Sequence, residues 1–488
     1  MTRAVFVAAV LSLTIACGQS SVFAQPTPEP PTFTSSGDAG FDAWRDDFAR
    51  RAVARGRDPA VLGRLLSGLR PDPSIVELDQ RQPEFVSPVW DYVTNRVTDR
   101  RISAGQQMKA QLGDTLSAIE QRYGVDSDIV LGIWALESNF GDAPLNYDAA
   151  ASLSTLAFEG RRRAQFETYL MALAEMVESG LADQTQLRSS WAGALGQPQF
   201  MPDVYLTTAV DWDGDGHRDI WNNQADVAAS IAHYLQDRGW QRGQPVFDEV
   251  TLPAGFDHAL ADGAARSVAD WDARGVRRID GQPWRAEDRG LQSQLFLPAG
   301  AQGPALILHP NFAVIRRYNN SDRYALVVAL LARGFEGRSG LQTAWPRHIG
   351  SLNREQTLEL QTLLNSLGYD AGPADGLFGS GTRRAVRAFQ TDRGQAADGF
   401  PTSALLDAVR ERAGVRPEPP PAPRALDSRG IRELQRLLTR LGYHPGRADG
   451  RIGPATREAI RRFERRQGME VRGRATDVVL RAARDAAG

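Results

Sequence analysis

Apolar residues in the first two thirds of the chain recur mainly at the spacing of helices. In one early segment Phe41, Trp44, Phe48 and Val53 fall near a single face, as expected of an amphipathic helix packed on a core. The stretch 113–196 continues mostly with helical periodicity, and "SDRYALVVALLARGF" (321–335) returns to it. We therefore expect a mainly helical region over 37–347.

A different pattern interrupts these helical segments. From about 241 to 317, short apolar runs are separated by turn residues, which is typical of strands. The predicted strands are 245–253, 292–298, 305–310 and 312–318. The fold class predicted for the large region is therefore mainly α (α+β), with a small β-rich insertion.

The last third of the chain contains an internal repeat. "LQTLLNSLGYDAGPADGLFGSGTRRAVRAFQ" starts at Leu360 and "LQRLLTRLGYHPGRADGRIGPATREAIRRFE" at Leu434, with 17 of 31 positions identical. Such a match without a gap indicates a duplicated unit. In the first unit a helix is predicted to end at Gly368, and Thr382, or Thr456 in the second unit, is suited to cap the next helix. Residues 352–412 and 427–486 are predicted to form two small three-helix bundles.

The N-terminus and two proline-rich segments indicate how the parts are delivered and joined. Residues 25–36 are predicted to be an extended tether and 413–426 a semi-rigid linker. Arg3 precedes an apolar run, and the small residues before Gln25 suit signal-peptidase cleavage, so 1–24 is predicted to be a signal peptide. We expect a periplasmic protein; lipid anchoring through Cys17 and a retained anchor are the alternatives.

Net charge and cysteine content exclude some classes of function for this protein. A formal net charge of −2 with 24% charged residues is ordinary for a globular protein and argues against nucleic-acid binding. Cys17 is the only cysteine, and cleavage before Gln25 would remove it. The mature protein would then depend on neither disulfides nor thiolate ligands.

The segment "WALESNFG" (134–141) holds a carboxylate among apolar neighbours. Glu137 ends a helical run between Trp134 and Phe140, and Gly141 is suited to end the helix in a left-handed turn. Desolvation by the two rings is expected to raise the pKa of Glu137, as a general acid acting on a glycosidic oxygen requires. From this local pattern alone, a structural or surface role is the commoner one for a glutamate at a helix end.

Four further segments change that weighting: "AFEGRRRAQF", "SSWAGALGQPQFMP", "ASIAHYL" and "RRYNNSDRYA". Together with "ESNFG" they resemble the signature of the lytic transglycosylase B family, periplasmic enzymes that cleave the glycan strands of peptidoglycan. The resemblance covers most of 37–347 and implies a lysozyme-like catalytic domain with Glu137 as the sole catalytic acid and base. It also implies a substrate cleft lined by Arg162, Arg163, Ser190, Gln199, Tyr234, Tyr318, Asn319 and Tyr324. Core packing is the alternative role for each tyrosine.

The number of carboxylates bears on the mechanism. Hydrolytic glycosidases usually need two, and no second acid with a comparable motif accompanies Glu137. Asp142 is predicted to stabilise a turn, and Glu159 to pair with Arg162 or Arg163. With one carboxyl, water need not be the attacking group. The family resemblance implies that the muramic C6 hydroxyl attacks C1 instead, held there at high effective concentration, and leaves a 1,6-anhydromuramic end. A lysozyme-like hydrolase and a non-catalytic peptidoglycan-binding scaffold are the alternatives.

A second candidate site is "DWDGDGHRDIWNNQAD" (211–226). Three alternating aspartates and Gly216 match the first half of a Ca²⁺-binding EF-hand loop, in which residue 217 offers a backbone carbonyl. Position twelve is Asn222 rather than the usual glutamate, and the family resemblance implies that Asp226 closes a longer loop. The expected ligands of a structural Ca²⁺, with no organic cofactor, are Asp211, Asp213, Asp215, His217, Asp219 and Asp226. A loop without metal is the alternative.

The two repeats resemble the peptidoglycan-binding domains found beside many cell-wall enzymes. The arginine-rich second repeat suits an anionic wall polymer, although a solvated basic face without a partner is the alternative. The expected partners are peptidoglycan glycan strands, with other cell-wall enzymes as further candidates, and a monomer is expected.

Overall fold

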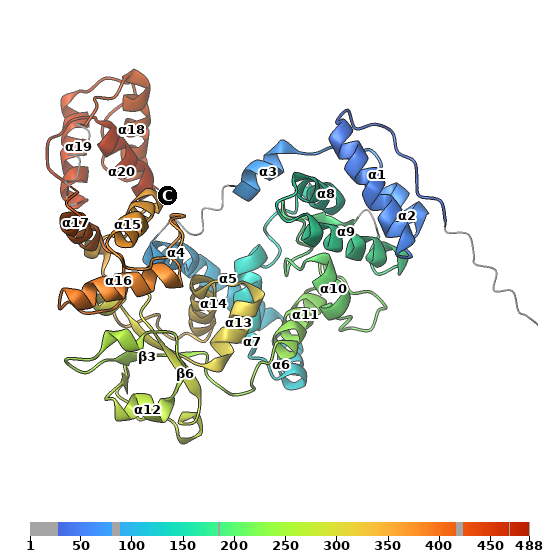
Figure 1. Cartoon of the computed structure of the whole chain (residues 1–488), viewed down its shortest axis with the longest axis horizontal. Coiled ribbons are helices and arrows are strands. Elements are labelled where there is room, and N and C mark those ends of the chain that lie inside the picture. The colour runs from blue at the N-terminus through green and yellow to red at the C-terminus, as the bar shows by residue number, and fades with distance from the viewer. Residues whose placement is uncertain (1–27, 81–87, 184–185, 416–422, 468, 488) are drawn as a thin grey trace, which may run out of the picture. The chain divides into compact units, whose positions relative to one another are not determined.

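The computed structural model describes residues 28–80, 88–183, 186–415, 423–467 and 469–487 (Figure 1). The chain forms two compact units that divide after Val409. The first unit contains the large helical domain, its β-rich insertion and the first repeat, and the second contains the second repeat. The predicted signal peptide 1–24, with Cys17, lies outside the described residues, as do residues 416–422 of the predicted linker.

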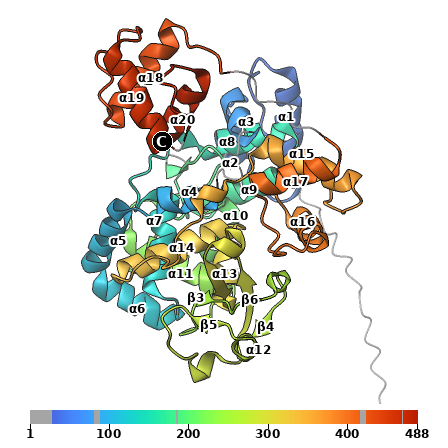
Figure 2. The same cartoon turned by 90° about the vertical axis from the view of Figure 1, so that its left-hand side faces the viewer.

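The large domain is mainly helical, as the periodicity predicted. α7, α11, α13 and α14 pack together in its middle, side by side in Figures 1 and 2. Its helices are α1 Ala39–Ala54, α2 Pro59–Leu66, α3 Pro73–Gln80, α4 Val89–Arg96, α5 Asp99–Gln111, α6 Gly113–Tyr123, α7 Ser127–Ser138, α8 Ala149–Glu159, α9 Arg163–Glu178, α10 Pro202–Thr208, α11 Gln224–Asp237, α13 Pro310–Tyr318 and α14 Asp322–Phe335. Two short strands, β1 Tyr147–Asp148 and β2 Arg188–Ser189, pair antiparallel.

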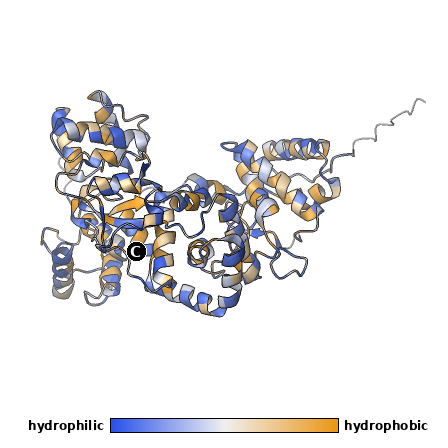
Figure 3. Ribbon diagram, turned by 90° about the horizontal axis from the view of Figure 1, so that it is seen from below, coloured by the Kyte–Doolittle hydropathy of each residue, from blue (hydrophilic) through white to orange (hydrophobic). Residues whose placement is uncertain are grey.

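Helix α7 is buried on nearly every side because its sequence is almost wholly apolar. Ile129 to Ala135 are all buried, and α5, α6, α11 and α14 pack around them. Gly132 lets α14 approach closely, since a Cβ there would lie 2.8 Å from the Val328 carbonyl oxygen. A helix that is apolar all round belongs inside the core. Outer helices show the alternation of hydrophobic and hydrophilic residues visible in Figure 3.

The β-rich insertion is a five-stranded antiparallel sheet in the order β4-β6-β7-β3-β5. It has its own core, in which Trp271 is fully buried and donates its indole N–H to the Ser293 carbonyl at 3.0 Å. The strands are β3 Phe247–Thr251, β4 Arg266–Ser267, β5 Arg277–Arg278, β6 Gln292–Phe296 and β7 Ala305–Leu308, with helix α12 Val268–Ala273 between β4 and β5. Short 3₁₀ helices cover His258–Leu260, Ala286–Asp288, Gly300–Gln302 and Arg347–Ile349.

One predicted strand is wrong. Residues 312–318 belong to α13, which begins at Pro310 in the first helical turn. Proline is favoured there because its fixed φ suits a helix and its missing N–H is not needed. Phe312 and Ile315 are buried at helical spacing, so the core accepts this segment as a helix although its apolar run also suits a strand.

Each repeat contains three helices around a small core. In the first, Gln361 is buried and its amide joins the Gly376 N–H to the Thr382 hydroxyl; in the second, Gln435 does the same for Gly450 and Thr456. The helices are α15 Arg354–Ser366, α16 Ser380–Asp392 and α17 Ser403–Arg412, then α18 Ser428–Arg440, α19 Pro454–Arg466 and α20 Asp477–Ala487.

Thr382 and Thr456 do not cap their helices, contrary to the prediction. The N-cap positions of α16 and α19 are Gly379 and Gly453, which offer no side chain. Both threonine hydroxyls point inward and bond to the buried glutamine of their repeat. A buried hydroxyl needs a partner, and the glutamine supplies it.

The first repeat packs against the large domain of the same unit. The Phe400 ring lies 6.3 Å from the Trp90 ring and keeps only 9% of its surface exposed. The Ala301 N–H donates to Asp398 Oδ2 at 2.8 Å, and Arg387 donates to a backbone carbonyl of the insertion.

Within the described residues, no helix is both long and apolar enough to cross a membrane.

Candidate active site

Glu137 occupies the last turn of α7. The helix ends at Ser138, and Asn139 forms a left-handed cap with φ of 50°. The sequence pattern placed the left-handed turn at Gly141, but it begins two residues earlier, at Asn139. Gly141 is required for a second reason: a Cβ there would lie 2.8 Å from the Gln197 side chain. The turn thus carries the chain sharply away just beyond the carboxylate.

The Glu137 carboxyl accepts a hydrogen bond from a tyrosine on α14. The Tyr324 hydroxyl donates to Glu137 Oε1 at 2.6 Å. Burial, and then the nearby charge of Glu137, raise the pKa of Tyr324 well above its ordinary value. The hydroxyl therefore stays protonated and remains a donor. The raised pKa expected for Glu137 itself stays a prediction.

Three predicted tyrosines form a continuous cluster. The Tyr318 ring lies parallel to Tyr324 at 6.5 Å, and Tyr234 meets Tyr318 edge-on at 4.8 Å. The Tyr318 hydroxyl donates to the Pro198 carbonyl at 2.5 Å, and the Tyr234 hydroxyl donates to the Arg317 carbonyl at 2.6 Å. Tyr234 is 8% exposed and Tyr324 3%, whereas Tyr318 is half-buried. Tyr318 is the tyrosine of the three best placed to offer a ring face to a sugar.

Trp134 makes a contact that the sequence did not predict, while its expected effect on the pKa of Glu137 stays a prediction. It is fully buried, and its indole N–H donates to Gln197 Oε1 at 2.8 Å while its ring packs edge-on against Phe140. The Gln197 amide in turn donates to the Trp221 carbonyl at 2.7 Å. Gln197 therefore ties the end of α7 to the loop before α11. Sequence reasoning missed this residue, although it lies in the segment that contains Gln199.

Ser190 and Gln199 both belong to the loop 190–200, whose Pro198 carbonyl accepts a hydrogen bond from the Tyr318 hydroxyl of the tyrosine cluster. The Ser190 backbone N–H donates to the Ala194 carbonyl at 2.9 Å, and the Ser190 hydroxyl accepts from the Ala194 N–H at 3.3 Å. Gln199 has a positive φ of 55°, and its amide donates to the Gly196 carbonyl at 2.9 Å. A positive φ at a non-glycine residue is a strained conformation that often marks functional loops.

Asn319 lies in the turn between α13 and α14 and is exposed. Its carbonyl accepts the Ser321 N–H at 2.7 Å, and the Ser321 hydroxyl caps α14 by accepting the Tyr324 N–H at 3.3 Å. This short turn holds Tyr318 and Tyr324 parallel to each other. Asn319 therefore lies beside the cluster, with its side chain exposed to solvent.

Arg162 and Arg163 lie apart from this cluster in their interactions. Arg162 donates to Asp79 Oδ1 at 2.8 Å, and Arg163 donates to the Phe158 carbonyl at 3.4 Å. The expected pairing of Glu159 with either arginine is therefore wrong, because Asp79, far away in the chain, takes Arg162. Asp142 does stabilise a turn, since it accepts from the Asn139 amide at 3.1 Å.

Three of the six predicted metal ligands converge. Asp211, Asp213 and Asp226 offer carboxylate oxygens within 4.8 Å of one another. Asp226 is fully buried and accepts the Trp212 and Asp219 N–H groups, each at 2.8 Å. Burial, followed by the charges of Asp213 and Asp211, raises the pKa of Asp226 to about 6. Converging carboxylates of this kind fit a divalent cation bound through oxygen.

The other three predicted ligands lie outside this group of side chains. The Asp215 carboxylate accepts the His217 N–H at 2.8 Å, and Asp219 accepts the Trp221 and Asn222 N–H groups at 2.9 Å. The side chains of Asp215, His217 and Asp219 are not part of the carboxylate group that converges within the described residues. The hydrogen bonds of Asp215 and Asp219 shape the loop, and ligation by the His217 backbone carbonyl stays a prediction.

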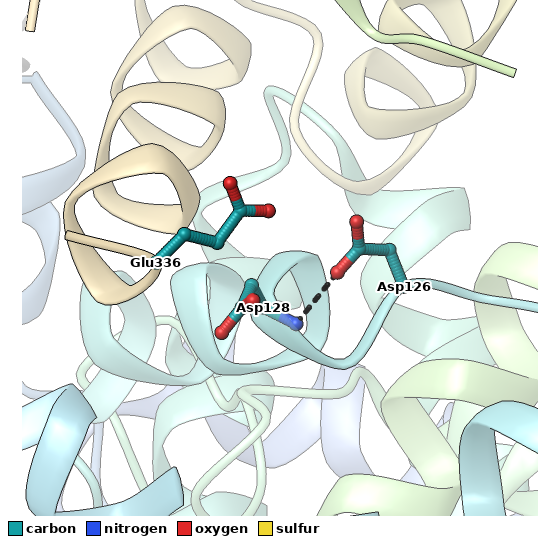
Figure 4. Close-up of side chains that lie close together, drawn as sticks. All are labelled: Asp126, Asp128 and Glu336. Atoms are coloured by element: carbon teal, nitrogen blue, oxygen red, sulfur yellow. Dashed lines mark hydrogen bonds between the residues drawn. The ribbon is translucent and has the colours of Figure 1, made fainter. Parts of the chain in front are cut away.

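A second acidic cluster, missed in the sequence, lies at the other end of α7. Figure 4 shows Glu336, beyond α14, facing Asp126 and Asp128 at the start of α7. Asp126 caps the helix by accepting the Asp128 N–H at 2.9 Å, and Lys109 lies 2.6 Å from Asp128 Oδ2. Burial, then the charges of Asp128 and its neighbours, raise the pKa of Asp126 to about 6.

Cavities lie at both ends of α7. One of about 330 Å³ borders Ser138, the residue after Glu137, together with Gly141 and Gln197. Another of about 600 Å³ lies at the far end, beside Asp126 and Ile129. The smaller cavity borders the residue after Glu137 and residues of the loop 190–200, and is therefore the better candidate for part of a substrate cleft.

Comparison with known families accounts for both parts of the chain. The family described as Transglycosylase SLT domain matches residues 40–333. The family described as putative peptidoglycan binding domain matches 353–409 and 427–482. Membrane-bound lytic murein transglycosylase B from Escherichia coli (strain K12) is 31% identical over 274 residues, which cover 54% of this chain and 71% of the relative.

Solved structures agree with these matches. SltB3 from Pseudomonas aeruginosa, in complex with NAG-anhNAM-pentapeptide, is similar at a TM-score of 0.74 and 43% identity, covering 76% of this chain and all of that one. The same comparison holds for its complex with NAG-NAM-pentapeptide. Escherichia coli lytic transglycosylase SLT35 in complex with calcium is similar at a TM-score of 0.52 and 28% identity, covering 62% of this chain and 93% of the relative.

Proposed function

Because this chain belongs to the lytic transglycosylase B family, with a transglycosylase SLT domain and two peptidoglycan-binding domains, we propose that Glu137 is its catalytic residue. The protein is a lysozyme-like peptidoglycan lyase. It cleaves the β-1,4 bond between N-acetylmuramic acid and N-acetylglucosamine and leaves 1,6-anhydromuramic ends.

The hydrogen bond between Tyr324 and Glu137 is the observation that carries the assignment. It holds one oxygen of the carboxyl group and so fixes the position of the group at the end of α7. Protonated Glu137 donates its proton to the glycosidic oxygen, and the bond from that oxygen to muramic C1 breaks. The carboxylate then removes the proton from the muramic C6 hydroxyl, whose oxygen bonds to C1 and closes the anhydro ring. Glu137 ends the cycle protonated, and no water is consumed.

The intramolecular attack explains why one carboxyl suffices. A hydroxyl of the same sugar is held close to C1 at a high effective concentration, so no second carboxylate is needed to activate water. Ser190, Gln199 and Asn319 bind polar groups of the glycan, and Tyr318 offers a ring face to a sugar. Tyr234 supports Tyr318 from the core. Arg162 and Arg163 are assigned to a more distant part of the strand, where both remain at least partly exposed.

Mass spectrometry of digested sacculi tests the function. Wild-type protein is expected to release fragments with anhydromuramic ends, while Glu137→Gln still binds sacculi without cutting them. Reducing muramic ends would show a hydrolase instead. No cleavage by the wild type would favour a binding scaffold.

We also propose a structural Ca²⁺ site in the loop 211–226. Asp211, Asp213 and Asp226 would hold the ion, and the calcium complex of the SLT35 relative supports this choice. The backbone carbonyl of His217 remains available as a further ligand. Because the ion would bind only the folded loop, millimolar Ca²⁺ is expected to raise the melting temperature. Asp213→Asn should remove that increase, with Mg²⁺ as the control ion; equal melting of wild type with and without Ca²⁺ would contradict the site.

Residues 1–24 are proposed to direct the protein to the periplasm, where its substrate lies. Fractionation of cells expressing the full chain and its Cys17→Ser variant tests this. Release of Cys17→Ser from the membrane, with the wild type retained there, would instead show lipid anchoring. Size-exclusion chromatography of the mature protein tests the expected monomer.

A further inference from the structure

The two repeats share one loop geometry but differ in the residues that flank the glycine of that loop. In the first repeat, Gly399 lies under the side chains of Arg383 and Arg387; in the second, Gly473 lies under Arg461 in the same way. Both glycines have a positive φ, 69° and 65°. The repeats are offset by 74 residues, so these glycines are equivalent positions on equivalent loops.

A buried side chain at equivalent positions holds each loop through the backbone N–H of its glycine. In the first repeat, the Gln390 amide donates to Asp398 at 2.7 Å and accepts the Gly399 N–H at 2.8 Å. In the second, Glu464 accepts both the Arg472 and Gly473 N–H groups, at 2.8 and 2.7 Å. The loop conformation is therefore retained although the residues flanking the glycine have changed.

Those flanking residues decide what the surface can bind. In the first repeat they are Asp398 and Phe400, which contact the large domain and are covered by it. Gly300 of the large domain makes this possible, since a Cβ there would lie 2.7 Å from Asp398 Oδ2. In the first repeat this face is therefore occupied by a contact with the large domain.

In the second repeat the same two positions are Arg472 and Arg474, and both are exposed. Arg457 and Arg461 of α19 are exposed beside them. Glu470 pairs with Arg472 and Glu458 with Arg461, and buried Glu464 lies beneath the loop, so the four arginines still outnumber the acids on and below this face. The surface formed by Arg457, Arg461, Arg472 and Arg474, here called the arginine face, is positively charged.

We propose that the second repeat binds the carboxylates of peptidoglycan stem peptides through this arginine face. The proposal rests on the proposed function, since it names the part of the wall that the repeat recognises. Charge complementarity selects the peptides, because their free carboxylates supply anionic groups along the wall. Guanidinium groups bind carboxylates in paired, charge-assisted hydrogen bonds. The first repeat cannot bind in this way, because its equivalent face carries an acid and is covered.

Binding to intact sacculi tests the proposal directly. All proteins carry Glu137→Gln, so that no strand is cut during the measurement. Arg472→Ala with Arg474→Ala is expected to weaken binding about tenfold at moderate salt, as the loss of two exposed charge-assisted bonds implies. The matched control is Arg436→Ala with Arg440→Ala, two exposed arginines on α18. The control is expected to bind as tightly as the parent, and an equal loss in both pairs would reduce the effect to general charge and overturn the proposal.

Sacculi stripped of stem peptides by an amidase separate the peptides from the glycan. The parent protein is expected to bind these stripped sacculi as weakly as the Arg472→Ala, Arg474→Ala variant binds intact sacculi. Undiminished binding by the parent would overturn the proposal, because it would show that the arginine face binds the glycan or another polymer rather than the peptides. Thermal melting checks that both double variants fold. Release of anhydromuramic fragments by protein with Glu137 intact is measured separately, so failure of the catalytic assignment cannot be mistaken for failure of this one.

Discussion

At the C-terminal end of α7, the Glu137 carboxyl accepts a hydrogen bond from the Tyr324 hydroxyl, whereas at the N-terminal end Asp128 pairs with Lys109 and Asp126 caps the helix. Both ends face partners from α14 or its end, and both adjoin a cavity. One helix therefore carries a carboxyl suited to proton transfer at one end and carboxylates engaged in structure at the other.

The partners account for the difference. Burial raises the pKa of Asp128, and the hydrogen bond and charge of Lys109 oppose that rise by favouring the charged carboxylate. A tyrosine hydroxyl positions a carboxyl without adding a charge, which suits a group that must act first as acid and then as base. Lys109 is the only lysine in the chain, and it contacts the structural cluster. The Lys109 ammonium is a compact charge, whereas the other strongly basic side chains of this protein are the broader, planar guanidinium groups of arginine.

The largest expected effect is at the catalytic end. Glu137→Gln keeps the shape of the side chain but removes the proton that is transferred, so turnover should fall by about 10³-fold or more. Release of anhydromuramic fragments measures it. Glu336→Gln, at the opposite end, is the control and should keep nearly full activity. Comparable losses in the two variants would erase the functional distinction between the ends of α7.

Tyr324→Phe tests whether the hydroxyl positions the carboxyl. The ring stays in place while the hydrogen bond to Glu137 is lost, so kcat should fall by about 10- to 100-fold with little change in KM. Steady-state kinetics on a soluble glycan fragment separate the two constants. Tyr234→Phe, whose hydroxyl bonds a backbone carbonyl, serves as the comparison and should lose less. A kcat unchanged by Tyr324→Phe would contradict a positioning role.

At the structural end, Lys109→Met should lower stability without changing chemistry. It leaves the buried Asp128 carboxylate without its cation, at an expected loss of about 2 kcal/mol in the free energy of unfolding. Urea denaturation measures the loss, and activity per folded molecule should be unchanged. Adding Asp128→Asn to Lys109→Met should restore most of the stability. A double variant no more stable than Lys109→Met would show that Lys109 acts through another contact.

The smallest expected effect depends on pH. Burial raises the pKa of Asp126 to about 6 in the folded protein, so folding favours the protonated form and the ionised form costs stability. The cost is absent below the unfolded pKa near 3.8 and develops as pH rises through 6. Asp126→Asn, which still caps a helix, should therefore stabilise by about 1 kcal/mol at pH 8.

Melting curves across pH test this sign. The gain from Asp126→Asn should shrink as pH falls through 6 and vanish near pH 4. A gain of the same size at every pH would mean that the substitution acts through packing or capping rather than through the charge.

Local sequence predicted the elements whose residues lie close together in the chain. The apolar run of α7, the repeat cores and three of the four strands follow from short patterns. The family motifs added Glu137 and the tyrosines. The prediction failed at 312–318, where an apolar run suits either a strand or a helix, and at Thr382, whose hydroxyl binds a buried glutamine. In both places a partner outside the segment decided the outcome.

The sequence by itself determined that this chain carries a glutamate at the end of a buried helix, a set of family motifs and two copies of one small domain. Periodicity and identity are local properties, and each can be counted along the chain. Only the tertiary structure decided that Tyr324 holds Glu137, that Gln197 links Trp134 to Trp221, and that Lys109 pairs with Asp128. These pairings join segments far apart in the chain, and the packing of helices, rather than any local preference, brings their side chains within hydrogen-bonding distance.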